Sequence, residues 1–394
     1  MSTLSDFYTQ QARQTKSSIA WIEEAKSKAL TAFEAFGFPD RHHEEWKYTA
    51  LDVFAAKNFT HGTAVCEATG NEGIVMMPLA QALIEYEALV KQHLNHIMHL
   101  EHAFHALNTA MLQDGVFVYV PEQVKAIQPI LLEYKQPKDG EAVYLRHLIV
   151  AEPGSEVVVV EVYQGTDAPY VTNTITEIHA AKHAKITHYK LQLESKQACH
   201  FGHVFVRQME QSHFQSHSLS LGGTLVRSDL TIDLKEEHAQ CLLNGIYAPN
   251  EGQHVDHHTI VNHLVPHGTS RQDYKGILQG KSRAVFNGKV LVARDAQKSS
   301  ASQSNKNLLL SAQAEIDTKP QLEIDADDVV CSHGATVGQL DEEALFYLAT
   351  RGINRQEAAL YLIQAFAAEN LALIPDEQMA RRCADLLNKQ TGAL

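Results

Sequence analysis

The sequence contains no run of about 18 apolar residues, the length that a membrane-spanning helix requires. Residues 1–16 also lack the basic and then apolar pattern of a secretory signal peptide. Both absences argue against a membrane protein or a secreted one. We therefore expect a cytoplasmic protein that does not bind membranes.

Basic residues are in short supply. The chain has 33 lysines and arginines against 47 aspartates and glutamates, which gives a formal net charge of −14. Because nucleic-acid binding depends on cationic side chains that neutralise phosphates, DNA and RNA are not expected partners. Cysteine is also scarce, with five widely spaced residues. This odd number favours reduced thiols over a disulfide framework.

The motifs of the common enzyme classes are missing as well. Residues 276–282 come near a phosphate-binding loop, but three residues separate Gly276 from Gly280, where that loop needs four. The sequence has no paired-cysteine zinc motif, zincin helix, nucleophile elbow or dinucleotide fingerprint. We therefore expect no catalytic activity, and any ATP hydrolysis would have to come from another chain.

The sequence does contain three segments of different pattern. Helical spacing of apolar residues over 17–36 and 78–112 predicts a mainly helical N-terminal region, residues 1–115. Short apolar runs separated by turn residues predict an all-β core over 116–338. Helical signals return in residues 339–394, where Asp341 and Asn354 are suited to cap helices. Periodicity leaves a sandwich, a barrel and a parallel β-helix open, and no fixed-period repeat is evident.

Histidine is abundant, with 23 residues, and two sets of them are closely spaced. The first set lies at positions 93, 96, 99, 102 and 105, where three-residue spacing on a helix makes a stripe that drifts around the surface. We interpret these rings as solvated or partly packed, although adjacent members could bind a divalent ion. The second set lies in the β segment and consists of His254, Asp256, His257, His258, His263 and His267. Alternation puts His254 and Asp256 on one face, which suits either a structural role or a zinc or iron site.

Cys331 and His333 form the most suggestive local pair. Residues two apart on a strand share a face, and a thiol beside an imidazole can bind iron–sulfur species, zinc or copper. Two ligands make only half of a metal site. A structural role and a site completed by a partner chain are therefore both consistent with the sequence.

Residues 282–310 and 317–353 resemble the core shared by the SufB/SufD family of iron–sulfur cluster assembly proteins. Residues 44–49 and 114–121 resemble N-terminal parts of the same family. The sequence Cys-Ser-His-Gly at 331–334 is similar to the SufD branch, because SufB typically has an acidic residue and a histidine there.

The resemblance implies a mainly β fold, with a right-handed parallel β-helix core flanked by helical N-terminal and C-terminal regions. It also implies a non-catalytic scaffold subunit that pairs with SufB and binds the SufC ATPase through helices in residues 341–374. Such a subunit contributes to iron acquisition and to nascent cluster formation at the SufB–SufD interface.

The resemblance also assigns residues to that interface. His333 corresponds to a candidate metal ligand on the SufD side, and Cys331 to a neighbouring interface cysteine. Iron or the nascent cluster would be shared transiently with SufB. The isolated protein is expected to hold no tightly bound cofactor and to form a homodimer.

Two other functions are consistent with the residues alone. The second histidine set would suit a stand-alone metal-binding β-helix protein. Glu323, Asp325 and Asp327, which we expect on one strand face, would suit a carbohydrate-active β-helix enzyme that uses paired carboxylates. Acidic residues at a strand edge are more often a solvated surface.

Overall fold

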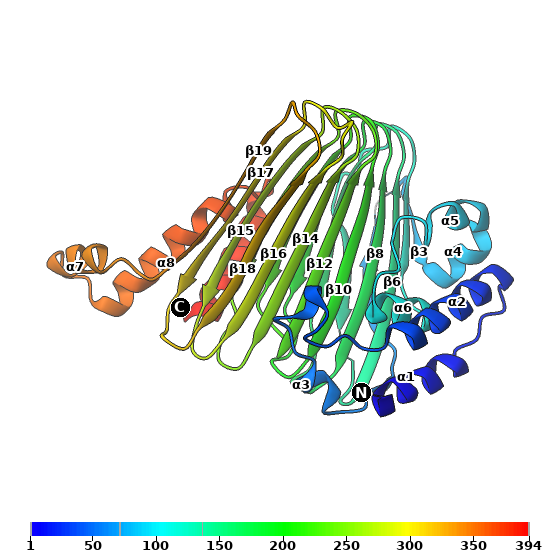
Figure 1. Ribbon diagram of the computed structural model, residues 1–394, viewed down its shortest axis with the longest axis horizontal. Helices are drawn as coiled ribbons and strands as arrows, with labels where there is room; N and C mark the ends of the chain where they lie inside the picture. The colour runs from blue at the N-terminus through cyan, green and yellow to red at the C-terminus, as the bar shows by residue number, and fades with distance from the viewer. Residues whose placement is uncertain (1, 71, 136, 393–394) are drawn as a thin grey trace.

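The computed structural model describes residues 2–70, 72–135 and 137–392, and a parallel β-solenoid forms its centre (Figure 1). Each turn of the solenoid adds one strand to each of two sheets, and eight turns run from the β4/β5 pair to the β18/β19 pair. The mainly β class and the parallel β-helix core are thereby confirmed.

The first sheet contains β3 (Val75–Pro78), β4 (Val116–Val120), β6 (Glu141–Ala151), β8 (Val171–Ala180), β10 (Cys199–Gln208), β12 (Leu225–Leu234), β14 (His254–His263), β16 (Arg283–Val292) and β18 (Glu315–Ile324), with β1 (Thr60–His61) beside β6. The second sheet contains β2 (Val65–Thr69), β5 (Ile130–Lys135), β7 (Glu156–Tyr163), β9 (Lys185–Gln192), β11 (His213–Ser220), β13 (Gln240–Tyr247), β15 (Thr269–Leu278), β17 (Ser300–Leu309) and β19 (Val330–Gly338). Only β2 and β3 pair antiparallel within the described residues, and they lie at the N-terminal end of the sheets.

The register explains why no fixed-period repeat is visible in the sequence. Val171 pairs with Cys199, 28 positions later, whereas Cys199 pairs with Leu225 after 26 positions and Arg283 with Glu315 after 32. Since the strands stay aligned residue by residue, the corner loops absorb the difference in length. In five successive turns, the loop from the first sheet to the second contains one non-glycine residue with positive φ, the left-handed backbone conformation: His183, Gln211, His238, His267 and Lys298.

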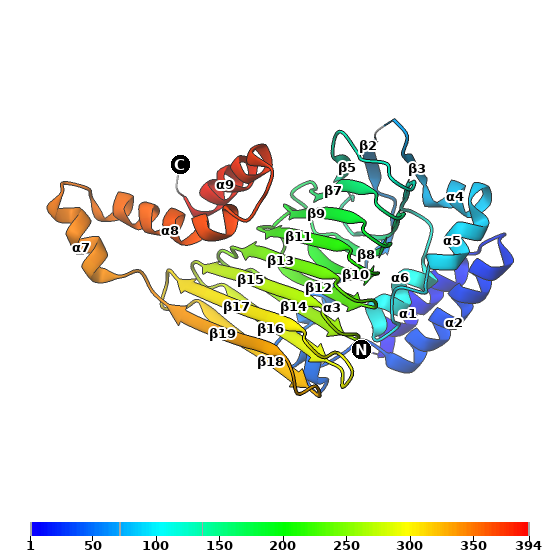
Figure 2. The ribbon, with the colours of Figure 1, turned by 90° about the horizontal axis from the view of Figure 1, so that it is seen from above.

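Helices of the N-terminal region cover the outer face of the first sheet (Figure 2). They are α1 (Ser2–Gln14), α2 (Ala20–Phe36), α3 (Asp52–Ala55), α4 (Leu79–Glu85), α5 (Glu87–His93) and α6 (Ala103–Ala110), with a short 3₁₀ turn at Glu44–Trp46. Aromatic rings form the contact, in which Phe104 of α6 stacks on Phe201 of β10 at 3.8 Å between ring centroids and Trp46 lies against Phe104 at 5.4 Å. Stacked and edge-on aromatic pairs add to the burial of apolar area, so this contact fixes the helices on the sheet.

The predicted single helix over residues 78–112 is wrong. The chain bends at Tyr86 between α4 and α5 and then leaves helical conformation from Leu94 to His102. The helical spacing of apolar residues nevertheless continues, because Leu94, Ile97 and Met98 are buried from within the loop. The N-terminal region also contributes the short strands β1, β2 and β3 to the sheets.

A buried ion pair holds this loop against the solenoid. Arg146 of β6 and Glu177 of β8 are fully buried and 2.8 Å apart. The Glu177 carboxylate also accepts backbone hydrogen bonds from Asn95, Ile97 and Met98, at 3.0, 3.1 and 3.0 Å. A buried carboxylate needs such donors to replace water. The non-helical conformation of this loop is therefore set by Glu177, which lies about 80 residues away in the sequence.

Three helices follow β19 in the described residues: α7 (Glu342–Thr350), α8 (Arg355–Leu371) and α9 (Glu377–Thr391). The predicted caps are confirmed, because the Asp341 carboxylate accepts from Glu343 N and the Asn354 side chain accepts from Glu357 N. Ile363 of α8 and Leu387 of α9 are buried against the second sheet, whereas α7 projects away from the solenoid (Figure 2). Among the described residues, no helix combines the length and apolarity needed to cross a membrane.

Candidate functional site

The last turn of the solenoid ends in two unpaired strand edges. β18 terminates the first sheet and β19 the second, and no strand within the described ranges covers their outer edges. Apolar side chains remain exposed there, with Val330 at 74% of its full exposure and Ile324 and Val337 also exposed. Exposed edges with free backbone groups favour pairing with another strand. This end of the molecule is therefore a candidate protein interface.

Cys331 and His333 both lie on β19, at this open end. Cys331 pairs with Ala301 and His333 with Gln303, residues whose side chains are buried inside the solenoid. Both side chains therefore face the interior side of the terminal turn. Cys331 is half-buried against apolar neighbours, and burial raises the pKa of its thiol, whereas His333 is exposed. A Cβ at Gly334 would meet no atom within 4 Å, so the backbone beside the pair is open.

Gln303, which lies opposite His333, has an unusual environment. Its side chain is buried, and neither of its polar atoms has a hydrogen-bond partner in the part of the chain that the structure describes. Buried amides nearly always have partners, because an unpaired group loses its hydration without compensation. This unpaired amide lies directly beneath the last strand, beside the Cys331–His333 pair.

Three members of the second histidine set, His254, Asp256 and His258, form a clasp between β14 and the N-terminal segment. His254 and Asp256 do face the same way, but Thr49 lies between them, 3.0 Å from His254 Nε2 and donating to Asp256 Oδ2 at 2.5 Å. Arg227 donates to the same carboxylate at 2.8 Å, and His258 lies 3.0 Å from its other oxygen. Although burial alone raises the pKa of Asp256, Arg227 and His258 hold it well below its usual range. The ring nitrogen of His254 and both oxygens of Asp256, which a metal ion would need as ligands, therefore already have protein partners.

Four histidines, including His257 and His263 of the second set, are buried within the solenoid beside uncharged partners. His217 lies 2.9 Å from Asn244, His257 3.0 Å from Ser220 and His263 2.8 Å from Ser270, while His147 lies 3.4 Å from Tyr134. Burial lowers the pKa of His147, His217 and His263 to about 4 and that of His257 to about 3. These rings are therefore neutral near pH 7.

The predicted carboxylate face does not form. Glu323 lies on β18, where it pairs with Lys289 at 2.8 Å, but Asp325 and Asp327 follow the end of that strand at Ile324. The three carboxylates consequently do not share a strand face, and that prediction is wrong.

The first histidine set does not form a helical stripe, since it spans α5, the loop and the start of α6. His102 and His105 instead meet His203 of β10, which the sequence did not single out. Nothing local to β10 indicated that His203 would meet a histidine about 100 residues away.

The chain matches two family models. Residues 134–366 match the SufBD core domain of the SUF system for iron–sulfur cluster assembly, and residues 1–71 and 63–132 match the SufBD protein N-terminal region. The chain is similar to the iron–sulfur cluster assembly protein SufD of Escherichia coli, with 34% identity over 88% of both chains.

The chain is also similar to two further members of this family. A SufBD family protein of Synechocystis is 31% identical over 90% of this chain and 87% of its own, and SufD of Bacillus subtilis is 26% identical over 81% and 74%. The chain belongs to the SufB/SufD family of iron–sulfur cluster assembly proteins and resembles its SufD members.

Proposed function

We propose that this protein is a non-catalytic cytoplasmic scaffold subunit of an iron–sulfur cluster assembly complex. It pairs with SufB through β18 and β19, binds the SufC ATPase through helices in residues 341–374, and contributes to iron acquisition and nascent cluster formation at the interface. The observation that carries the proposal is the open end of both sheets, which leaves strand edges, apolar side chains and the Cys331–His333 pair uncovered.

The backbone of β19 is suited to strand pairing. Val330 N donates to Ser299 O of the neighbouring chain segment at 3.0 Å. Since direction alternates along a strand, the N–H groups of Cys331, His333 and Ala335 point to the free edge. A partner strand at this edge would bring its own side chains next to Cys331 and His333.

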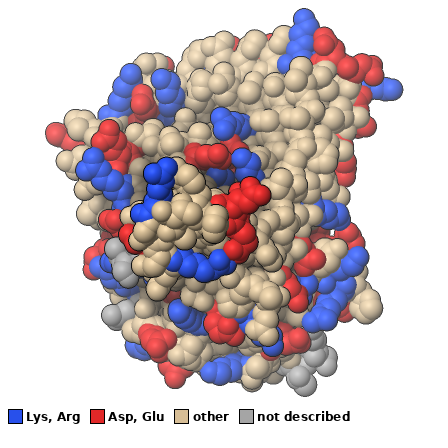
Figure 3. Space-filling model, turned by 90° about the vertical axis from the view of Figure 1, so that its left-hand side faces the viewer, with Lys and Arg blue, Asp and Glu red and all other residues tan. Residues whose placement is uncertain are grey.

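The SufC contact is supported by the exposed apolar surface of α7 and α8. Phe346 is 72% exposed, and Tyr347 and Tyr361 are also exposed. Lysine, arginine, aspartate and glutamate side chains of both signs surround uncharged atoms on the side of the molecule from which α7 projects (Figure 3). An apolar centre with a charged rim is the usual composition of a protein interface. An exposed Arg355–Glu342 ion pair at 2.6 Å links the two helices.

Cys331 and His333 would supply half of a site for iron or the nascent cluster. Thiolate and imidazole are ligands that iron–sulfur species accept, and SufB would supply the remaining ligands. The shared species is cargo and is held only transiently. Alone, the chain would pair its free edges with those of a second copy and form a homodimer.

Pairing with SufB is tested by coexpression with SufB and SufC chains of the same genome. Ala335→Pro removes one edge N–H without removing a bond to β17, so it should prevent copurification of SufB. The matched control Ala335→Val keeps the N–H and should retain SufB. Equal recovery of SufB with both variants would contradict edge pairing.

The SufC contact is tested in the same coexpression. Phe346→Ala with Tyr361→Ala should release SufC while SufB remains bound.

The metal role of His333 is tested in the assembled complex. His333→Ala should leave the complex intact but abolish cluster reconstitution, measured by visible absorbance and iron content. Cys331→Ser should give a comparable loss if the thiol is a ligand and a milder one if it is only a neighbour. A normal cluster yield from His333→Ala would assign that ring a structural role.

A further inference from the structure

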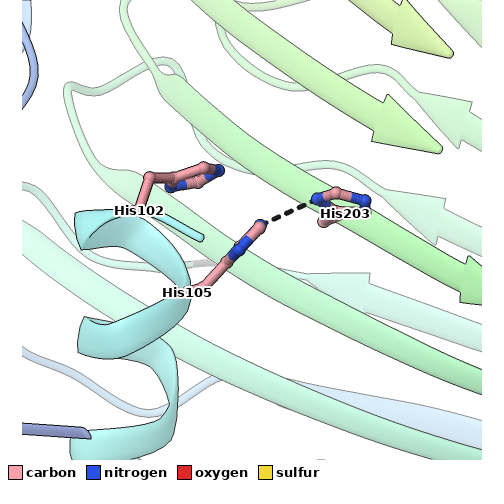
Figure 4. A group of neighbouring side chains, drawn as sticks. All are labelled: His102, His105 and His203. Carbon is pink, nitrogen blue, oxygen red and sulfur yellow. Dashed lines mark hydrogen bonds between the residues drawn. The ribbon is translucent and has the colours of Figure 1, made fainter. Parts of the chain in front are cut away.

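Three histidines from distant parts of the chain meet beneath the N-terminal helices (Figure 4). His102 caps the start of α6, His105 is the third residue of that helix, and His203 lies on β10. Each ring offers a nitrogen, and the three nitrogens lie within 4.8 Å of one another. His105 Nε2 and His203 Nδ1 are 2.8 Å apart. The cluster is remote in sequence from the open end of the solenoid.

A carboxylate lies beside two of the three rings. Asp229 Oδ2 of β12 lies 3.9 Å from His203 Nδ1 and 4.0 Å from His102 Nε2. Arg227 donates to the other oxygen, Oδ1, at 2.7 Å, which leaves Oδ2 directed toward the histidines. The charge of Arg227 is balanced by Asp229 and by Asp256, so the cluster does not face an uncompensated cation.

The surroundings allow an ion to enter. A cavity of about 450 Å³ is lined by His102, His203, Asp229 and Trp46, among others. The His102 side chain remains 20% exposed, while His105 and His203 are buried. Burial lowers the pKa of His105 to about 3 and holds the pKa values of His102 and His203 well below the usual one. The rings are therefore neutral and need lose no proton to act as ligands.

The cluster can adjust to metal geometry with small movements. Tetrahedral ligands at about 2.0–2.1 Å from zinc lie about 3.4 Å apart, so the 2.8 Å contact between His105 and His203 must open slightly and His102 must approach. His203 Nε2 lies 2.9 Å from Thr231 Oγ1, and this hydroxyl can accept the ring hydrogen when Nδ1 binds the ion. When the ion binds, the His102 ring gives up a long hydrogen bond of 3.3 Å, which its Nδ1 accepts from Phe104 N.

We propose that His102, His105 and His203, with Asp229 as the fourth ligand, bind one divalent transition-metal ion between α6 and the solenoid. Three imidazoles and a carboxylate are a donor set that suits zinc or ferrous iron and excludes calcium, which prefers oxygen ligands. The ion would join the N-terminal helices to β10 and β12. This proposal concerns the isolated chain and does not depend on its pairing with SufB or SufC.

Zinc titration of the tag-free protein tests the site. Calorimetry should show one tight equivalent per chain, and X-ray absorption at the zinc edge should show imidazole nitrogens at about 2.0–2.1 Å. His105→Gln and His203→Gln should each weaken binding by about 100-fold or more, because loss of a second-shell partner alone costs about 10–100-fold. Thr231→Val retains all three rings and should weaken binding by about 10–100-fold.

The control addresses adventitious binding by surface histidines. His238 and His267 stack at a solenoid corner, 4.8 Å between ring centroids, and the double variant H238Q/H267Q should keep the tight equivalent. Circular dichroism and thermal unfolding establish that each variant is folded. If a ligand variant does not fold, the comparison of Thr231→Val with wild type decides the question. Absence of tight zinc binding in wild type, unchanged binding in the ligand variants or in Thr231→Val, or loss only in H238Q/H267Q would overturn the proposal.

Discussion

The buried histidines of the solenoid should make the protein sensitive to mild acid. His147, His217, His257 and His263 have folded pKa values of about 3 to 4, against about 6.5 for an exposed histidine. Between these limits the unfolded chain binds more protons than the folded chain. Stability contributed by the neutral rings is therefore present above pH 6.5 and is lost as the pH falls.

The size of the effect follows from the same values. At pH 5.5 the unfolded rings are about nine-tenths protonated while the folded rings remain neutral, so each lowers the free energy of unfolding by about 1.4 kcal/mol. Four rings together lower it by about 6 kcal/mol, which is comparable with the whole stability of many domains, about 5–15 kcal/mol. His258 acts in the opposite direction: although burial lowers its pKa and Arg227 disfavours its charge, Asp256 and Glu45 give a net rise.

Urea unfolding followed by the fluorescence of Trp21 and Trp46 measures this difference between pH 7.5 and pH 5.5. His263→Gln removes one of the titrating rings and should reduce the difference in the free energy of unfolding between the two pH values by about 1.4 kcal/mol. Ser270→Ala removes only the hydrogen-bond partner of that ring, at 2.8 Å, and should lower stability about equally at both pH values. A free energy of unfolding that changes by less than about 1 kcal/mol between the two pH values would refute the reasoning.

Two further predictions concern the packing of the N-terminal region. Arg146→Met leaves the fully buried Glu177 without its cation and should lower the free energy of unfolding, measured in urea, by about 3–5 kcal/mol. The same change at the exposed Arg355 should leave stability nearly unchanged. Similar losses at both sites would contradict this. Gly115→Ala should yield no folded protein by circular dichroism, because φ is +147° and the new Cβ would lie 1.6 Å from Arg146 O. Gly252 also has positive φ, but a Cβ there would meet no atom within 4 Å, so Gly252→Ala should fold. A folded Gly115→Ala protein would refute the steric argument.

Elements with local signals could be predicted from the sequence. The strand at Val116–Val120 and the helix starts after Asp341 and Asn354 appear as expected, because β-branched runs and capping side chains act on their immediate neighbours. The solenoid itself came from family resemblance, since corner loops of varying length hide its period.

Features set by distant partners could not be predicted. The loop from Leu94 to His102 carries helical apolar spacing, but Glu177 binds its backbone and overrides that preference. His102 and His105 were noticed as part of a stripe, whereas His203 joins them only because β10 lies under α6. The position of Cys331 and His333 at an uncovered end follows from the number of solenoid turns, which no local pattern specifies.

The clasp between Thr49 and Asp256 also has a consequence for synthesis. The two residues are 207 positions apart, and Glu45 likewise pairs with His258. At about 5–20 residues per second a ribosome needs roughly 10–40 seconds to make that length of chain. Each solenoid turn can settle on the turn made just before it, but the segment around Trp46 must wait for strands that emerge much later. The segment around Trp46 thus stays without these partners until β14 has been made.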